Sequence, residues 1–180
     1  STLLHRAELI TQIENKFNRR GDIQAVALVG VGGSGKTTLA RQYARMHKAN
    51  VIWQIDSETS EALKNSFEKL SSALAQTEED QKQLRSLRGI KNSKEKEEKI
   101  LLFVKERMKS HPYWLLIYDN VEKFKDIQPF YPHDPTVWGN GRIIITTQDL
   151  NIQNNSLVSH VIQVDDLTPS QKLILFLNIM

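Results

Sequence analysis

Short apolar runs alternate along the chain with longer segments that have helical periodicity. Most of these runs are hydrophobic at successive positions, which is typical of strands covered on both faces in a parallel sheet. Five runs predict strands, at residues 25–29, 51–55, 114–118, 142–146 and 161–164. Helical patterns cover residues 3–20, 37–47, 58–75 and 94–110, whereas the polar stretch 76–93 predicts no element. This order predicts an α/β fold, a doubly wound sandwich with helices on both faces of the sheet.

The last residues of the chain predict the start of another unit. Thr168 is followed by a proline at a first helical position and by Gln171, which is the arrangement of an N-cap with a capping box. Apolar residues at helical spacing come next. We therefore expect residues 1–166 to form the main domain, and residues 167–180 to form the first helix of a following helical domain.

The segment GVGGSGKTT, residues 30–38, follows the first predicted strand and precedes a helical pattern. Its glycines, lysine and threonine match the spacing of a phosphate-binding P-loop. Glycines let backbone N–H groups approach phosphate oxygens closely, and the following helix adds the positive end of its dipole. Lys36 is expected to reach the β- and γ-phosphates, and the Thr37 hydroxyl to bind Mg²⁺. The predicted nucleotide contacts in this loop are Gly30, Val31, Gly32, Gly33, Ser34, Gly35, Lys36, Thr37 and Thr38.

A carboxylate ends the third predicted strand, where the run WLLIY is followed by Asp119. Ligands of parallel sheets bind outside the carboxyl ends of the strands, so we expect Asp119 to complete the Mg²⁺ site with Thr37. Hydrolysis also needs a group that orients or deprotonates the attacking water. The next residue, Asn120, can orient a water but cannot accept its proton. The predicted catalytic residues are Lys36, Asp119 and Asn120.

Two other acidic residues are candidates for the base. Glu122 lies two residues beyond Asn120, and Asp56 follows the second predicted strand. We interpret Asp56 instead as the N-cap of the helix at 58–75.

Polar residues also follow the fourth predicted strand, where Thr146, Thr147 and Gln148 stand in succession. If this strand lies between the strands that lead to the P-loop and to Asp119, its end faces the γ-phosphate. These side chains could then detect whether that phosphate is present.

Composition and charge narrow the range of partners. The chain has no cysteine, which excludes disulfides and thiolate metal sites and fits a cytoplasmic protein. It has no run of about 18 apolar residues, so we expect no membrane span. Ten Lys or Arg and four Glu give residues 82–109 a net charge of +6, against +3 for the whole chain. Apolar residues at helical spacing lie beneath these charges and interleaved aromatic residues are missing, so a solvated helix face is favoured over an arm that binds nucleic acid.

The complete set of motifs resembles the NB-ARC branch of the STAND ATPases, a signal-transduction group of P-loop NTPases. The matching stretches are HRAELITQI, VALVGVGGSGKTTLARQYA, WLLIYDNVE, GRIIITTQD and VDDLTPSQKLILF, from residue 5 to about 176. The resemblance implies a three-layer P-loop NTPase sandwich whose five-stranded parallel sheet has the order 5-1-4-3-2. It also implies binding of ATP or ADP, with Arg6 near the adenine. It further implies nucleotide-dependent homo-oligomers, and helical, winged-helix and repeat domains later in a longer chain.

Two positions depart from that family's pattern. Gln148 replaces the usual arginine at the end of the sensor motif, and Asn120 stands where a second acidic residue often follows the aspartate. Both changes remove charge from the place where hydrolysis needs it. We therefore predict a cytoplasmic ATP/ADP-binding regulatory switch with slow, Mg²⁺-dependent hydrolysis. The alternative is an active P-loop kinase or a mechanically coupled ATPase.

Overall fold

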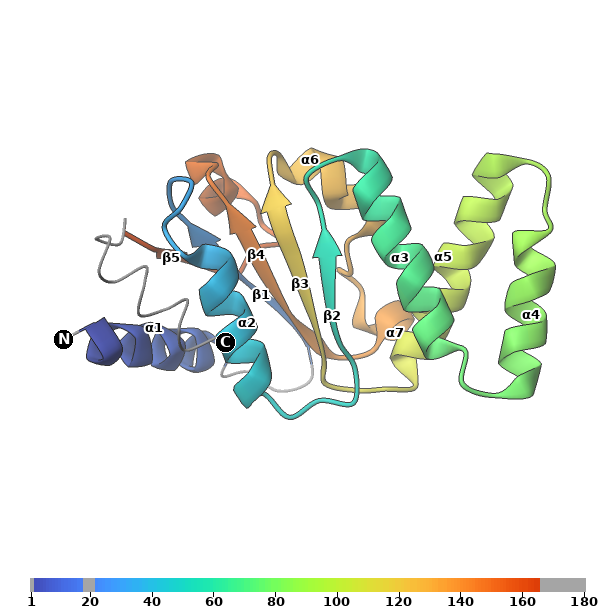
Figure 1. Cartoon of the computed structure of the whole chain (residues 1–180), viewed down its shortest axis with the longest axis horizontal. Helices are drawn as coiled ribbons and strands as arrows, with labels where there is room; N and C mark the ends of the chain where they lie inside the picture. The colour runs from blue at the N-terminus through green and yellow to red at the C-terminus, as the bar shows by residue number, and fades with distance from the viewer. Residues whose placement is uncertain (1, 18–21, 166–180) are drawn as a thin grey trace.

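Five strands form one parallel sheet in the order β2-β3-β4-β1-β5 (Figure 1). The structure is a computed structural model and describes residues 2–17 and 22–165. The strands are β1 (Ile23–Val29), β2 (Ile52–Asp56), β3 (Trp114–Val121), β4 (Gly141–Thr147) and β5 (His160–Gln163). The order is the predicted 5-1-4-3-2 counted from the opposite edge, so the predicted strands and their arrangement are confirmed.

Helices cover both faces of the sheet, which confirms the predicted three-layer α/β sandwich. One face carries α1 (Thr2–Lys16) and α2 (Lys36–Met46). The other face carries α3 (Ser60–Leu74) and α5 (Ser93–Lys109), with the short helices α6 (Phe124–Ile127) and α7 (Pro135–Trp138). Two 3-10 turns, η1 (Gln128–Phe130) and η2 (Leu150–Asn154), follow α6 and β4.

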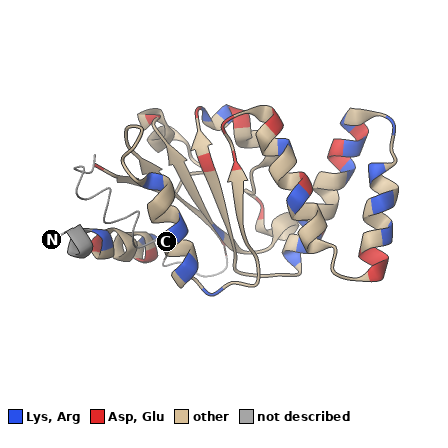
Figure 2. Cartoon of the chain, in the orientation of Figure 1, with Lys and Arg blue, Asp and Glu red and all other residues tan. Residues whose placement is uncertain are grey.

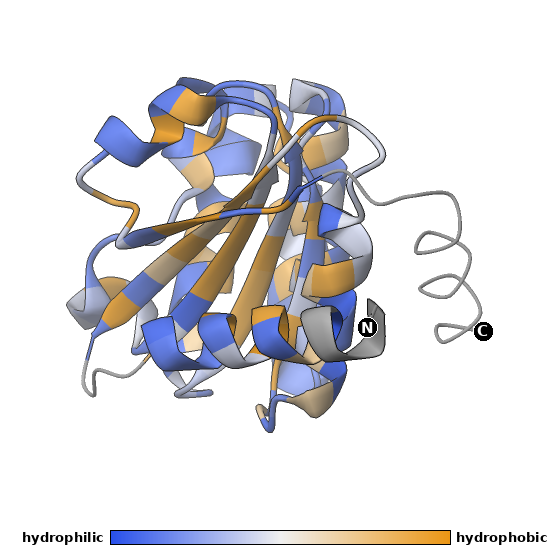
Figure 3. Cartoon of the chain, turned by 90° about the vertical axis from the view of Figure 1, so that its left-hand side faces the viewer, coloured by the Kyte–Doolittle hydropathy of each residue, from blue (hydrophilic) through white to orange (hydrophobic). Residues whose placement is uncertain are grey.

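Side chains along the central strands alternate between two cores. In β1, Val26 and Leu28 belong to the core beneath α1 and α2. Ala25, Ala27 and Val29 belong to the core beneath α3 and α5. Figure 3 shows the apolar residues concentrated on the strands between the two helical layers. Because both faces of the sheet are covered, apolar residues occupy successive positions, and this is why the strands stand out in the sequence.

The stretch at 76–93, for which the sequence predicts no element, contains the helix α4 (Glu78–Arg88). The hydroxyl of Thr77 caps it by accepting a backbone N–H of the first turn, which is acidic, while the last turn is basic. Both features stabilise a helix. Leu84 packs against Ile100 and Phe103 of α5. Since α4 lies on the outer side of α5, away from the sheet, only a narrow apolar stripe is needed, and the hydrophobic pattern does not reveal the helix (Figure 1).

Within the described ranges, no helix has both the length and the hydrophobicity that crossing a membrane requires. The predicted helix at 167–180, and with it the expected domain boundary, lies outside the described residues.

Candidate functional site

The predicted phosphate loop joins β1 to α2 at the carboxyl end of the sheet. Gly33 and Gly35 have φ angles of 82° and 89°, in the left-handed region that glycine adopts without strain. Gly35 is also the N-cap of α2 and offers no side-chain cap to the first N–H groups of the helix. The uncapped start of α2 is therefore suited to binding an anion.

Neighbouring strands hold this loop on both sides. The N–H of Gly30 donates to the carbonyl oxygen of Thr147 at 3.2 Å, and that of Val164 donates to Val29 at 2.7 Å. A Cβ atom on Gly30 would collide with the carbonyl oxygen of Val164. The first glycine is thus required by the close approach of the backbone that follows β5, in addition to any phosphate.

The Lys36 amino group lies inside the curve of the loop. It donates to the carbonyl oxygens of Gly30 at 2.7 Å and Val31 at 2.9 Å, and to Ser34 Oγ at 3.4 Å. Its side chain is buried. A buried cation at the N-terminus of a helix favours a negatively charged ligand.

Asp119, at the end of β3, contacts the threonine that the sequence pairs with it. Thr37 Oγ1 donates to Asp119 Oδ1 at 2.7 Å, and Thr146 Oγ1 donates to the same oxygen at 2.6 Å. Among residues 2–17 and 22–165, the other oxygen, Oδ2, has only long contacts, at 3.4 Å to Asn120 Nδ2 and 3.5 Å to Gln54 Nε2. The structure therefore brings together the two predicted Mg²⁺ ligands and leaves one carboxylate oxygen weakly bonded.

The donor set fits magnesium. A hydroxyl and a carboxylate supply hard oxygen ligands, and Mg²⁺ in nucleotide sites uses one or two such groups together with water and phosphate. No cluster of three or more His, Asp or Glu side chains suited to a metal occurs among residues 2–17 and 22–165. A cation at Thr37 and Asp119 would accordingly take its remaining ligands from water and nucleotide.

Asn120 lies on a β-bulge of β3. Its φ is 60°, a left-handed conformation that asparagine tolerates better than most residues, and the register with β4 shifts between Tyr118 and Val121. Its backbone N–H donates to Thr146 Oγ1 at 2.9 Å, and its side chain is exposed beside Asp119. The amide is thus presented at the rim of the site.

The three polar residues at the end of β4 have different environments. Thr146 and Thr147 are buried, and their hydroxyls donate to Asp119 and to the Val121 carbonyl oxygen. Gln148 is exposed, and a Cβ atom on Gly32 would lie 3.3 Å from its Nε2. Because β4 does lie between β1 and β3, Gln148 lies beside the phosphate loop. The hydroxyls of the two threonines instead donate to residues of β3.

The interpretation of Asp56 as a helix cap is wrong. The helix α3 begins at Ser60, and Thr59 is its N-cap, accepting the N–H of Ala62. Asp56 instead accepts the N–H of Glu58 and is the register partner of Asp119 in the adjacent strand. The sequence misplaces the cap because aspartate and threonine are both common N-cap residues, and only the start of the helix decides between Asp56 and Thr59.

The remaining residues named from the sequence are Thr38, Glu122 and Arg6. Thr38 is half-buried in the first turn of α2, and Glu122 is exposed. Arg6 lies on α1, and its buried Nη1 has no hydrogen-bond partner within the described ranges.

Gln54 is a site residue that the sequence analysis misses. Its side chain accepts from Arg41 Nε at 2.9 Å and reaches Asp119 Oδ2 at 3.5 Å. The available signal was a polar residue inside the apolar run VIWQI, at a position where a strand covered on both faces rarely carries one.

The comparison with known families agrees with this geometry. The sequence profile of the NB-ARC domain matches residues 6–180. The chain belongs to the NB-ARC family. This NB-ARC chain is accordingly a nucleotide-binding signalling domain with a P-loop NTPase fold. No curated protein matches it.

Two solved structures are similar to the NB-ARC chain. One is a signal transduction ATPase with numerous domains (STAND) and a tetratricopeptide repeat sensor from Pyrococcus horikoshii, with 19% identity, a TM-score of 0.49, and coverage of 92% of this chain and 23% of that one. The other is the Aeropyrum pernix ORC2 protein in ADPNP–ADP complexes, with 13% identity, a TM-score of 0.46, and coverage of 98% and 50%. The NB-ARC chain thus spans a quarter to a half of these proteins.

Proposed function

We propose that this NB-ARC domain binds ATP and ADP with Mg²⁺ at residues 30–38 and acts as a regulatory switch that hydrolyses ATP slowly. The observation that carries the proposal is the 2.7 Å hydrogen bond from Thr37 to Asp119, beside the buried amino group of Lys36. It joins the first turn of α2, directly after the phosphate loop, to the carboxyl end of β3, and a nucleotide–magnesium complex needs protein ligands from both places.

Each residue has a definite part in binding. The N–H groups of the loop and of the first turn of α2 donate to phosphate oxygens, and Lys36 exchanges its carbonyl partners for the β- and γ-phosphates. Thr37 can donate to Asp119 and still offer a lone pair to the cation. A bound Mg²⁺ would neutralise charge on the phosphates. Arg6 is proposed to lie near the adenine.

Slow turnover is expected because the groups beside the γ-phosphate position are neutral. Asn120 can hold a water but cannot accept a proton from it, and Gln148 brings no positive charge to the loop. P-loop enzymes without such a charge hydrolyse nucleotide at rates on the order of 10⁻³ s⁻¹, several orders of magnitude below assisted rates. Bound ATP would therefore remain intact long enough to distinguish an ATP-bound state of the domain from an ADP-bound state.

The switch is proposed to control assembly of a longer, cytoplasmic chain. ADP would hold a resting form and ATP a homo-oligomer, with helical, winged-helix and repeat domains after residue 180 sensing the signal. The family membership supports this arrangement.

The test is to identify the nucleotide that co-purifies with the full-length protein and then to measure steady-state ATP turnover. We expect bound ADP, turnover below about 0.01 s⁻¹, and loss of nucleotide from Lys36→Ala. The matched control is Lys48→Ala, an exposed lysine beyond the end of α2. Turnover of several per second that is unchanged in Gln148→Ala would contradict the proposal and favour a mechanically coupled ATPase. Phosphate transfer to a small acceptor would contradict it in favour of a kinase.

A further inference from the structure

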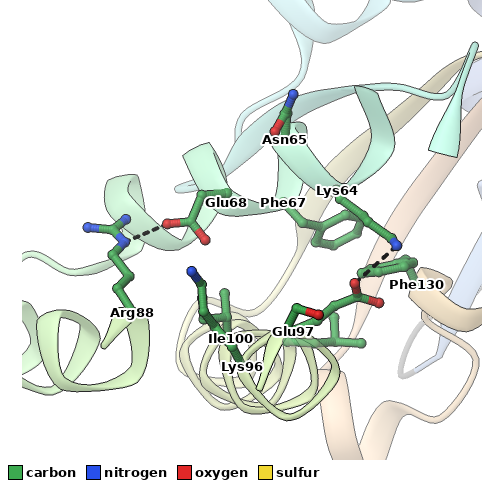
Figure 4. Close-up of a pocket in the computed structure, with 11 residues that line it drawn as sticks. Lys64, Asn65, Phe67, Glu68, Arg88, Lys96, Glu97, Ile100 and Phe130 are labelled. Carbon is green, nitrogen blue, oxygen red and sulfur yellow. Dashed lines mark hydrogen bonds and ion pairs between the residues drawn. The ribbon is translucent and has the colours of Figure 1, made fainter. Parts of the chain in front are cut away.

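A cavity separate from the phosphate loop lies on the face of the sheet opposite to α2. It has a volume of about 430 Å³ and opens between α3 and α5, with Arg88 from the end of α4 and Phe130 from η1 at its ends (Figure 4). None of the residues that line it belongs to the phosphate loop. Its volume lies in the range of roughly 300–1,000 Å³ that is typical of small-molecule sites.

The floor of the cavity is apolar. Phe67, Ile100 and Phe130 are buried and line it, with the half-buried Leu101 beside them. The rings of Phe67 and Phe130 are 5.1 Å apart and tilted by 36°. A flat aromatic or aliphatic group on this floor would lose water on one side and gain ring contacts on the other.

The rim carries charges that are mostly paired with one another. Lys64 binds Glu97 at 3.1 Å, and Arg88 binds Glu68 at 2.5 Å and also donates to the Ser72 hydroxyl (Figure 4). Both carboxylates of the rim are therefore neutralised by neighbouring cations.

Lys96 is the exception on this rim. It is half-buried at the cavity, and its amino group has no hydrogen-bond or ion-pair partner in the described part of the chain. With three cations and two carboxylates, the lining has one positive charge in excess. The basic segment 82–109, whose +6 charge favours anions, supplies part of the cavity lining. Figure 2 shows the Lys and Arg residues of this segment along α4 and α5.

We propose that this cavity is a second ligand site that binds a small amphipathic anion, an aromatic or aliphatic carboxylate. Its apolar part rests on Phe67, Ile100 and Phe130, and its carboxylate binds the Lys96 amino group. In this proposal the basic segment binds an anionic ligand, a role that the nucleotide site does not give it. A nucleic-acid strand fits less well, because one unpaired cation among the described lining residues, beside an apolar floor, does not match the repeating charges of a phosphate backbone.

The probe for this site is 2-naphthoate, with its uncharged analogue 2-naphthamide as the comparison. Binding is followed by methyl NMR of the full chain with Mg²⁺ and ADP present in excess. We expect naphthoate to shift the methyl signals of Ile100 and Leu101 with a Kd of about 1 mM or below, which is the range for a ligand of this size. We expect naphthamide to bind roughly five- to ten-fold more weakly, because it lacks the charge that pairs with Lys96.

Two variants separate the site from general electrostatics. Lys96→Gln is expected to lower the affinity for naphthoate roughly five- to ten-fold and to leave that for naphthamide unchanged. Lys94→Gln is the matched control, since it removes the same charge from an exposed position on the same helix, outside the cavity. Equal losses in the two variants, equal binding of the two probes, or shifts that map elsewhere would overturn the proposal. The local methyl signals report on this cavity whether or not the phosphate loop binds ADP, so the two proposals can fail independently.

Discussion

Asp119 accepts two short hydrogen bonds at one oxygen, from Thr37 and Thr146. Short bonds to a buried carboxylate are charge-assisted and hold the group in one orientation. The second oxygen, with contacts of 3.4 and 3.5 Å, is then the one best placed to bind a cation. Thr146 therefore acts as a positioning residue, because it orients the carboxylate and also receives the N–H of Asn120.

Replacing Thr146 by valine tests this role. The side chain is fully buried and nearly the same size, so the change removes the hydroxyl and leaves the N–H of Asn120 without that acceptor. We expect the free energy of unfolding to fall by about 1–3 kcal/mol and the Mg²⁺-dependent part of ADP affinity to fall roughly ten-fold. Urea unfolding measures the first effect, and titration of ADP with and without Mg²⁺ measures the second.

The control for this prediction is Thr147→Val, which removes an equally buried hydroxyl that bonds to the Val121 carbonyl oxygen. It should destabilise the fold by a similar amount without changing the response to Mg²⁺. A similar loss of Mg²⁺ dependence in both variants would show that Thr146 has only a structural role.

At the scale of elements, one arginine of the sheet forms hydrogen bonds with both α1 and α2. Arg142 of β4 donates to Glu14 of α1 at 3.1 Å and to the hydroxyl of Tyr43 of α2 at 2.7 Å. Tyr43 in turn donates to Glu14 at 2.6 Å, and the guanidinium lies 5.1 Å from the centre of the Phe17 ring. A single surface ion pair contributes little, but this guanidinium also spans two helices and a ring.

We expect Arg142→Met to lower the free energy of unfolding by about 1–2 kcal/mol and to loosen α1 selectively. Hydrogen exchange should then show faster exchange at the amides of α1 than at those of α3. Arg45→Met is the control, because Arg45 is an exposed cation on α2, the helix that carries Tyr43. Uniform acceleration over the whole chain would indicate a general loss of stability and would refute a specific tie to α1.

At the scale of the whole molecule, a histidine connects stability to pH. His47 follows α2, stacks at 5.8 Å on Tyr43 and lies 3.4 Å from Arg142. Burial, and then the positive charge of Arg142, lower the pKa of His47 below its ordinary value of 6.5. A hydrogen bond with the backbone of Tyr113, and then the negative charge of Glu14, act on this pKa in the opposite direction but are outweighed. The folded protein therefore binds this proton less readily than the unfolded chain does.

The sign of the pH dependence follows from this difference. The contribution of neutral His47 is complete above about pH 6.5, the unfolded value, and is lost as the pH falls toward the lower pKa of the folded state. We expect His47→Gln to lose less stability than the parent protein between about pH 7.5 and pH 5.5, measured by urea unfolding. Identical losses would mean that the imidazole is not shielded in the way the structure places it.

Much of the fold can be predicted from local pattern. The strands are visible because the sheet is covered on both faces, and the P-loop is visible because close approach to phosphate restricts the residue types to glycine, lysine and threonine. α4 is not visible, since its burial against α5 involves few side chains. The Thr77 cap and the acidic first turn were the signals that could have revealed it. Asp56 and Thr59 show the converse case, in which local chemistry allows two caps and packing selects one.

The sequence by itself determined the five strands, the phosphate loop and the carboxylate at Asp119, because each depends on residue type and spacing within one short segment. Only the tertiary structure decided which distant side chains meet. It placed Thr146 and Gln54 on Asp119, Gln148 beside Gly32, and a lone Lys96 at the rim of an apolar cavity. These contacts join residues of different strands and helices. Hydrophobic periodicity describes only one element at a time, so it does not indicate which side chains of two elements come together in the folded chain.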